Sequence, residues 1–144
     1  MGKKRIAKKG ETGTESEGAT RVASRLSRRE LAIGTVHIHA TYNNTKVLLS
    51  DPNGNTVAWS SSGSLGFKGA KKGTPFAAAK VGELIGDKAA ELGMKEATAV
   101  VKGVGSGRES ALRSFASRGI QITGIKDTTP IPFNGPKPPK PRRV

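Results

Sequence analysis

Apolar and polar residues alternate along three short segments in the first half of the chain. In the first segment Val36, Ile38 and Ala40 are separated by polar neighbours, a period of two that predicts a strand with one buried face. Asp51-Pro52-Asn53-Gly54 has the residue order that a type I turn favours, so it predicts a chain reversal. The pattern therefore predicts a three-strand meander, with strands over residues 35–41, 46–50 and 55–60.

The apolar spacing becomes helical after this meander. Thr74 followed by Pro75 predicts a helix start, because the hydroxyl can cap the helix and the proline has no N–H to leave unpaired. Gly93 and Gly119 each follow a run of apolar residues at helical spacing, as glycines that end helices do. The remaining elements are predicted as helices over residues 75–92 and 108–118 and strands over residues 96–101 and 120–125.

This order of elements predicts an α/β fold with one five-stranded mixed sheet and two helices. Strands separated by helices are usually joined in parallel, whereas the meander is antiparallel. We expect three parts: a basic N-terminal extension (1–32), a globular domain (33–126) and a Pro/Lys/Arg-rich tail (127–144). Within the extension, Val22 and Leu26 fall on one side of a possible helix.

The chain is strongly basic. Its 144 residues hold 25 Lys and Arg against 11 Asp and Glu, a formal charge of +14. Residues 1–30 carry a net +5 and residues 127–144 a net +3, and both lack the apolar periodicity that repays chain ordering. We expect both arms to be disordered or extended alone, with the six prolines from Pro130 to Pro141 stiffening the tail. Such a charge indicates a polyanionic partner, either nucleic acid or an acidic membrane.

Several protein classes are disfavoured by composition. Without cysteine there is no disulfide framework, and no apolar run approaches the ~18 residues of a membrane span. The basic start runs into ETGTESEG and not into the apolar stretch of a signal peptide. We therefore expect a cytoplasmic protein with no membrane partner, and neither arm has an apolar face to insert.

A glycine-rich segment, Lys102-Gly103-Val104-Gly105-Ser106-Gly107-Arg108, lies between a predicted strand and a predicted helix. Alternate glycines let backbone N–H groups approach an anion, and the helix start adds its positive dipole end. The segment is not a dinucleotide fingerprint, because Arg108 stands at the third glycine position, and it lacks the Gly-Lys-Ser/Thr ending of a P-loop. An anion site and a tight structural turn both remain open, and the flanking cations favour the anion site.

A second basic segment precedes the first helix. Residues 61–73 have no periodicity and are expected to be loop, and they contain Lys68, Lys71 and Lys72. Alone, such a segment is most often a solvated linker. Because both basic loops precede helices of an α/β unit, we expect them at one edge of the sheet, as a cationic shelf for phosphates.

Catalytic constellations are absent from the pattern. His37 and His39 share one strand face, but the chain has no third His and no Cys, so a polar strand face is expected and no metal or cofactor. Two-metal cleavage of a phosphodiester needs clustered carboxylates, and the predicted meander has none before Asp51. We expect a non-enzymatic protein without a small-molecule substrate. A metal-dependent nuclease is the disfavoured alternative, and a free nucleic-acid chaperone is another. Trp59 is expected in packing more than in base stacking.

Five motifs resemble one family in order and spacing. They are HIHATYNNT, DPNGNTVAWSSSGSLGFKGAKKGTPFAAA, ELGMK, VKGVGSGRESALRSFASRGI and ITGIKDTTPIPFNGPKPPKPRRV. Over residues 32–144 the chain is similar to the eleventh protein of the small ribosomal subunit, in its bacterial form. The resemblance implies a ribonuclease-H-like sheet without catalysis and a structural role on the subunit platform. It also implies binding to small-subunit ribosomal RNA, near the messenger exit and the leader-pairing region, beside neighbouring platform proteins.

The resemblance also implies which residues bind RNA. These are Asn43, Asn44 and Lys46 in the hairpin; Lys68, Lys71 and Lys72 in the first loop; Lys102, Gly103, Gly105, Gly107 and Arg108 in the second loop; and Asn134, Gly135, Lys137, Lys140, Arg142 and Arg143 in the tail. The family usually has prolines where Val104 and Ser106 stand, so this loop is expected to be more flexible. It commonly has His where Phe133 stands.

Overall fold

Five strands and two α-helices form within residues 30–141, the part of the chain that this computed structural model describes. The α/β class and the five-stranded mixed sheet predicted from the sequence are confirmed. The strands are β1 (Ile33–Ala40), β2 (Thr45–Ser50), β3 (Thr56–Ser61), β4 (Glu96–Lys102) and β5 (Gln121–Asp127), and the helices are α2 (Pro75–Glu91) and α3 (Gly107–Ala116).

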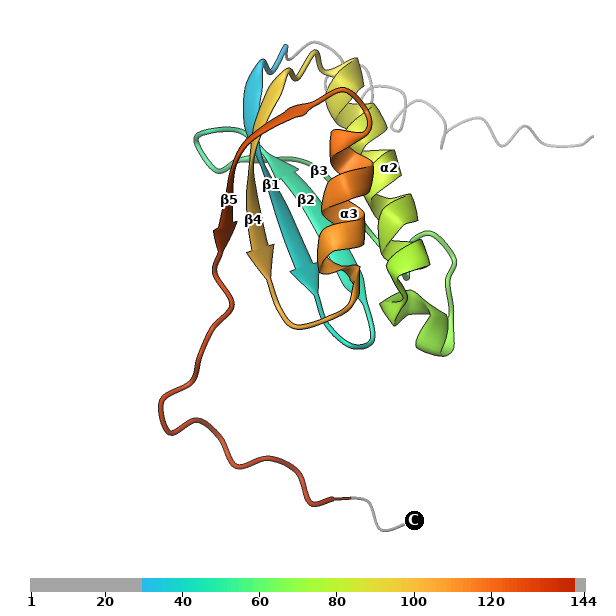
Figure 1. Ribbon diagram of the computed structural model, residues 1–144, viewed down its shortest axis with the longest axis vertical. Helices are drawn as coiled ribbons and strands as arrows, with labels where there is room; N and C mark the ends of the chain where they lie inside the picture. The colour runs from blue at the N-terminus through green and yellow to red at the C-terminus, as the bar shows by residue number, and fades with distance from the viewer. Residues whose placement is uncertain (1–29, 142–144) are drawn as a thin grey trace, which may run out of the picture.

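The sheet has the strand order β3-β2-β1-β4-β5 (Figure 1). The meander pairs antiparallel, β1 with β2 and β2 with β3, whereas β4 lies parallel to both β1 and β5. The turn predicted at residues 51–54 is present, with the Gly54 N–H donating to the Asp51 carbonyl over 2.9 Å. As a result β1, β3, β4 and β5 all run in one direction, and their C-terminal ends meet at one edge of the sheet.

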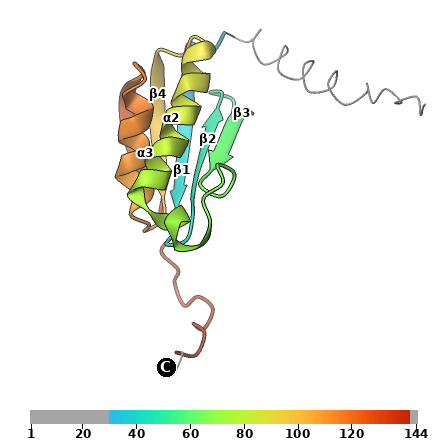
Figure 2. The same cartoon turned by 90° about the vertical axis from the view of Figure 1, so that its right-hand side faces the viewer.

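Both helices cover the same face of the sheet, and the opposite face carries no element of the described chain (Figure 2). The alternation in β1 places Val36, Ile38 and Ala40 towards the helices, each at most 1% exposed. From α2 and α3, Ile85 and Phe115 are completely buried against this layer. Removing one such side chain from water contributes about 1.5–3 kcal/mol, so this mostly aliphatic interior holds the two layers together.

The helices approach each other closely because α2 carries glycine at the crossing. A Cβ on Gly82 would lie 2.4 Å from the Ala111 carbonyl oxygen of α3, a separation that real Cβ atoms do not show. Arg118, two residues after α3, adds ion pairs to α2, 3.4 Å from Glu83 and 3.3 Å from Asp87. The pair α2 and α3 therefore forms one closely packed layer over the sheet.

Several expectations differ in detail from the structure. Residues 61–73, expected to be loop throughout, contain a 3-10 helix, η1 (Gly69–Gly73), and β3 extends to Ser61. The helix considered around Val22 and Leu26 lies outside the described residues. The three-part division of the chain and the ribonuclease-H-like label remain predictions.

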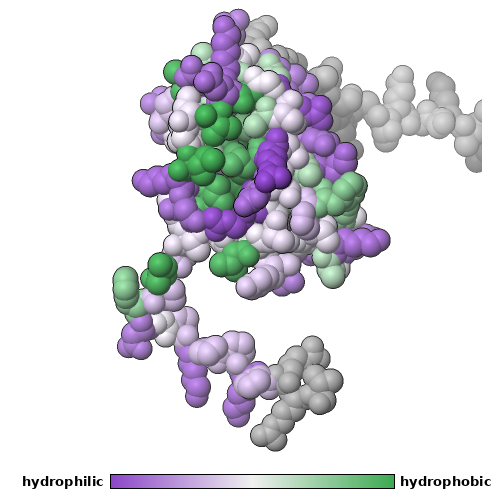
Figure 3. All heavy atoms as spheres, in the orientation of Figure 1, coloured by the Kyte–Doolittle hydropathy of each residue, from purple (hydrophilic) through white to green (hydrophobic). Residues whose placement is uncertain are grey.

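The edge strand β5 is incompletely covered. Figure 3 shows an apolar patch beside α3, on the helix side of the sheet. Ile122 and Ile125 pair in register with the buried Ala97 and Ala99, yet Ile125 is 66% exposed. The helices thus protect the centre of the sheet and leave its β5 edge open.

Candidate nucleic-acid interface

Four segments emerge at the C-terminal edge of the sheet, which we call the rim. They are the β1–β2 hairpin (41–44), the loop after β3 (62–74), the loop after β4 (103–106) and the start of the tail (128–130) (Figure 1). Since β1, β3, β4 and β5 share one direction, both basic loops lie at this edge. The sequence prediction that they emerge at one edge of the sheet is confirmed.

The hairpin and the two basic loops interlock through close backbone contacts. A Cβ on Gly73 would lie 2.0 Å from the Tyr42 carbonyl oxygen, so only glycine lets the first loop pass the hairpin. The Ser106 hydroxyl of the second loop donates to the Gly73 carbonyl over 3.0 Å. Ser106 thus joins the two loops, and the greater flexibility expected of its loop remains a prediction.

The first basic loop presents its ammonium groups outward. Lys68 and Lys71 are exposed and Lys72 is half-buried, and η1 buries none of its residues. The Thr74 hydroxyl accepts from the Ala77 N–H over 3.3 Å, which confirms the predicted cap of α2, and donates to the Lys71 carbonyl over 2.6 Å. The lysines of the first basic loop therefore lie on η1 and its N-cap, and Thr74 joins this turn to α2.

The second basic loop uses its glycines differently from the expected phosphate cradle. The Gly105 N–H donates to the Ala40 carbonyl over 3.0 Å, and the Gly103 N–H donates to the Thr129 hydroxyl over 3.2 Å. A Cβ at either glycine would lie within 2.3 Å of a carbonyl oxygen of Ala40 or Thr41. Both N–H groups already donate within the protein, which favours the tight structural turn, the other of the two alternatives, at these glycines.

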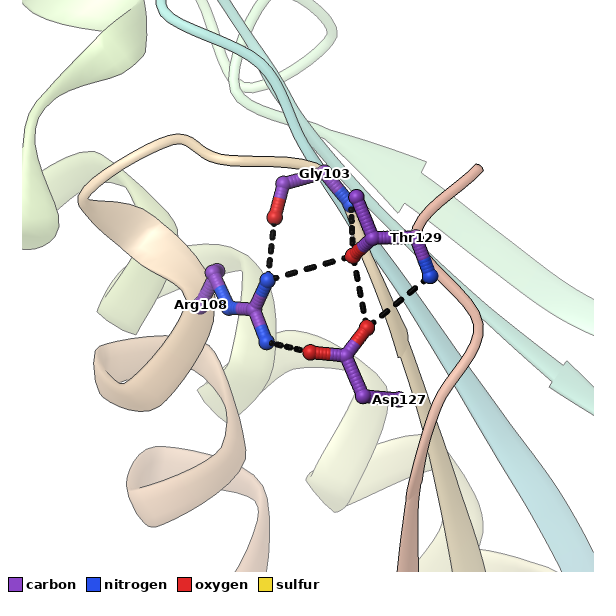
Figure 4. Close-up of polar contacts among 4 residues, drawn as sticks. All are labelled: Gly103, Arg108, Asp127 and Thr129. Carbon is purple, nitrogen blue, oxygen red and sulfur yellow. Dashed lines mark hydrogen bonds and ion pairs between the residues drawn. The ribbon is translucent and has the colours of Figure 1, made fainter. Parts of the chain in front are cut away.

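Arg108 lies in a network that joins this loop to the tail (Figure 4). Its guanidinium donates to the Gly103 carbonyl, to the Thr129 hydroxyl over 3.3 Å and to the Asp127 carboxylate. Thr129 in turn donates to Asp127 from its hydroxyl over 2.6 Å and from its N–H over 2.9 Å. Arg108, predicted as a cation for phosphate, is thus paired with a carboxylate at the point where the tail begins.

The network changes the acidity of Asp127. The Thr129 hydroxyl hydrogen bond, followed by those from Arg108 and the Thr129 N–H, holds the pKa of the Asp127 carboxyl well below its ordinary value of 3.8. The carboxylate remains ionised at neutral pH and keeps Arg108 partnered. Residues 127–129 form an Asx-type turn, a local signal that was readable from Asp-Thr-Thr in the sequence and was missed.

The predicted RNA-binding residues of the hairpin differ in their exposure to solvent. Asn43 and Lys46 are exposed. The Asn44 carbonyl accepts from the Thr41 N–H over 2.8 Å, while the Asn44 side-chain Oδ1 is shielded from solvent and accepts no hydrogen bond from the described residues. Asn44 therefore shapes the turn.

The tail leaves β5 and extends away from the globular domain (Figure 1). Asn134, with a φ of 53°, forms a bend next to Gly135, and Lys137 and Lys140 are exposed beyond it. Figure 3 shows hydrophilic side chains along this stretch, after an apolar start that contains Ile131 and Phe133. Arg142 and Arg143 lie outside the described residues.

The uncovered face of the sheet holds the remaining candidates. Trp59 is 60% exposed there, so the expectation that it packs in the core is wrong. His37 hydrogen bonds to the Ser50 hydroxyl over 3.0 Å, and His39 is exposed two residues further along β1. Residues 30–141 contain no group of three or more His, Asp or Glu that could hold a metal ion. In the same range, no helix is both long and apolar enough to cross a membrane.

A comparison with known protein families finds a match that covers most of the chain. The family model described as ribosomal protein S11 matches residues 34–143. The matched range contains the whole rim, both basic loops and the tail up to Arg143.

Proposed function

The chain belongs to the ribosomal protein S11 family, and from that premise we propose that its rim binds small-subunit ribosomal RNA. It is a structural component of the small ribosomal subunit and not an enzyme. Its association with ribosomal RNA and with other ribosomal proteins follows from the family. The surface that makes the RNA contact is our proposal.

The observation that carries this proposal is the convergence of exposed cations on one rigid edge. The side chains of Lys46 and Lys102 lie on the uncovered face next to the rim, in register with His39 between them. Lys68, Lys71 and Lys72 lie on the adjoining turn of η1 and its cap. Ammonium groups neutralise phosphates without reading bases, and an RNA helix presents mainly phosphates and 2′-hydroxyls to such a surface.

The predicted RNA-binding residues then take two roles. The exposed lysines and Asn43 contact the RNA, together with the tail residues Asn134, Gly135, Lys137, Lys140, Arg142 and Arg143. The remaining residues position the contact surface: Asn44 shapes the hairpin, Gly103 and Gly105 let the second loop lie on β1, and Arg108 fixes the tail. Gly107 belongs with them, because a Cβ there would lie 2.5 Å from the Thr45 hydroxyl.

We place the protein on the platform of the small subunit, beside other platform proteins and near the messenger exit and the leader-pairing region. Support for this placement comes from the five motifs that resemble the family over residues 32–144. The tail supports it too, because an extended basic strand that leaves the rim can follow RNA away from the domain.

The salt dependence of binding to small-subunit ribosomal RNA tests the proposal. If about eight cations contact phosphates, the affinity should fall with salt with a log–log slope of roughly −5 to −7. Filter binding between 50 and 300 mM salt measures this slope, and sedimentation of the small subunit checks for one copy per particle. A flat salt dependence, or a protein that stays off the particle, contradicts the proposed function.

A further inference from the structure

A hollow of about 370 Å³ lies at the rim, on the uncovered face of the sheet. Its lining comes from three segments: Tyr42 and its neighbours in the hairpin, Lys102 to Val104 after β4, and Thr129 and Pro130 at the start of the tail. The volume falls within the range of about 300–1,000 Å³ that small-ligand pockets occupy. Lys102 and Gly103, predicted from the sequence to bind RNA, line it, but the sequence predicts no hollow at this place.

The lining is a poor match for phosphate and a good one for a flat ring. It includes the side chains of Val104 and Pro130, and Tyr42 at one side is 78% exposed. Unpaired RNA bases are commonly bound by stacking on an aromatic side chain within an otherwise apolar site. The apolar lining therefore suits an unpaired base, whereas the cations around it suit phosphates.

The mouth of the hollow carries the charge that a nucleotide would need. His39 pairs in register with Lys46 on one side and with Lys102 on the other, so two ammonium groups flank an imidazole on one face. Both His39 and Lys102 also line the hollow. If the base of a nucleotide lay in the hollow, the phosphates on either side of that nucleotide would lie next to these cations.

The wall formed by the tail is held in place before any ligand arrives. Thr129 is fixed by Asp127, by Arg108 and by the Gly103 N–H (Figure 4). The adjoining wall, formed by the second loop, is fixed where the Gly105 N–H donates to the Ala40 carbonyl. Preformed walls lower the ordering cost of binding.

We propose that this hollow binds one unpaired base of the ribosomal RNA, stacked on Tyr42 with its phosphates beside Lys46 and Lys102. The inference rests on the proposed function and adds a base-binding site to a surface that otherwise contacts backbone. Stacking alone distinguishes bases weakly, so the site selects an unpaired nucleotide more than a sequence.

Two short probes of equal charge isolate the contribution of the base. Affinities of the full-length protein are measured for hexaadenylate and for the same hexamer with abasic riboses. The wild-type protein should prefer hexaadenylate, and Tyr42→Ala should reduce that preference by about 5- to 150-fold, the range found when one stacking aromatic is removed. Tyr42→Phe should retain the preference, because the ring remains.

Trp59→Ala is the matched control, since Trp59 is an exposed aromatic on the same face that does not line the hollow. It should leave the base preference unchanged. Equal wild-type affinity for the two hexamers, or equal losses in Tyr42→Ala and Trp59→Ala, overturns the base site. Steep, salt-dependent binding to ribosomal RNA would persist in that case, so the two proposals fail independently.

Discussion

The two basic loops look alike in sequence and differ in structure. Each combines glycine and lysine directly before a helix, yet η1 in the first loop buries no residue, whereas the second loop lies against β1. In the first loop Lys68 and Lys71 face solvent and Lys72 is half-buried. In the second loop Arg108 is paired with Asp127 and Thr129. The comparison teaches that a basic glycine-rich loop can supply charge to a ligand or can use charge to hold the protein together.

The largest expected effect compares alanine at Gly103, which is packed on β1, with alanine at Gly69, at the open start of η1. Gly73, at the other end of η1, is itself packed against Tyr42. Gly103→Ala places a Cβ 2.1 Å from the Ala40 carbonyl oxygen at a φ of 98°, so it should destabilise the fold by about 2–5 kcal/mol. Gly69→Ala in η1 has a φ of 62° but meets no atom within 4 Å, so about 1–2 kcal/mol is expected. Urea unfolding measures both. Equal costs would contradict close packing of the second loop on β1.

Removal of cations should weaken RNA binding more in the first loop than in the second, the reverse of the order expected for stability. The double variant Lys71→Ala/Lys72→Ala should make the log–log salt slope of RNA binding shallower by about 1.4–1.8, with stability changed by less than about 0.5 kcal/mol. Arg108→Ala should change the slope by less than about 0.5 and should lower the urea midpoint, because its cation is already partnered. A slope change of about one or more in Arg108→Ala would show that Arg108 contacts phosphate directly.

The smallest expected effect concerns the link from the second loop to the tail. Because the pKa of Asp127 is lowered from 3.8, the link is fully present above about pH 4 and is lost as the pH falls further towards the folded-state value. Hydrogen exchange of the Thr129 amide, corrected for its intrinsic rate, should be constant from pH 7 to 5 and faster below pH 4. Asp127→Asn should give several-fold faster exchange already at pH 7.

Glu109→Gln is the control for this link. Glu109 pairs with Arg113 on α3, and both side chains are 82% exposed. Its removal should leave the Thr129 exchange rate unchanged. An Asp127→Asn protein with the same protection as this control would show that the network does not fix the tail.

The local elements were predictable because short-range signals specify them. The alternation in β1, the Thr74-Pro75 start of α2 and the turn before Gly54 each depend on neighbours within a few residues. The placement of both basic loops at one edge also followed, since parallel connection through helices brings strand ends together. These signals were enough for the fold class and for the location of the rim.

The rest depends on contacts between distant residues. Arg108 meets Asp127 only because β5 lies beside β4, and nothing in the loop itself indicates that pairing. Trp59 was expected inside because large aromatics usually pack, but no element of the described chain covers its face. The hollow at Tyr42 needs three separate segments to meet, so no single motif could indicate it.

Because of the direction of β1, the described chain enters the sheet at one edge and leaves it at the other. The described chain enters the sheet at Ile33, and the tail departs from the opposite end of the neighbouring strands (Figure 1). An eight-residue strand is about 26 Å long, so the two edges of the sheet lie about that far apart. The strands therefore hold the point where the described chain enters the sheet and the point where the tail leaves it about 26 Å apart.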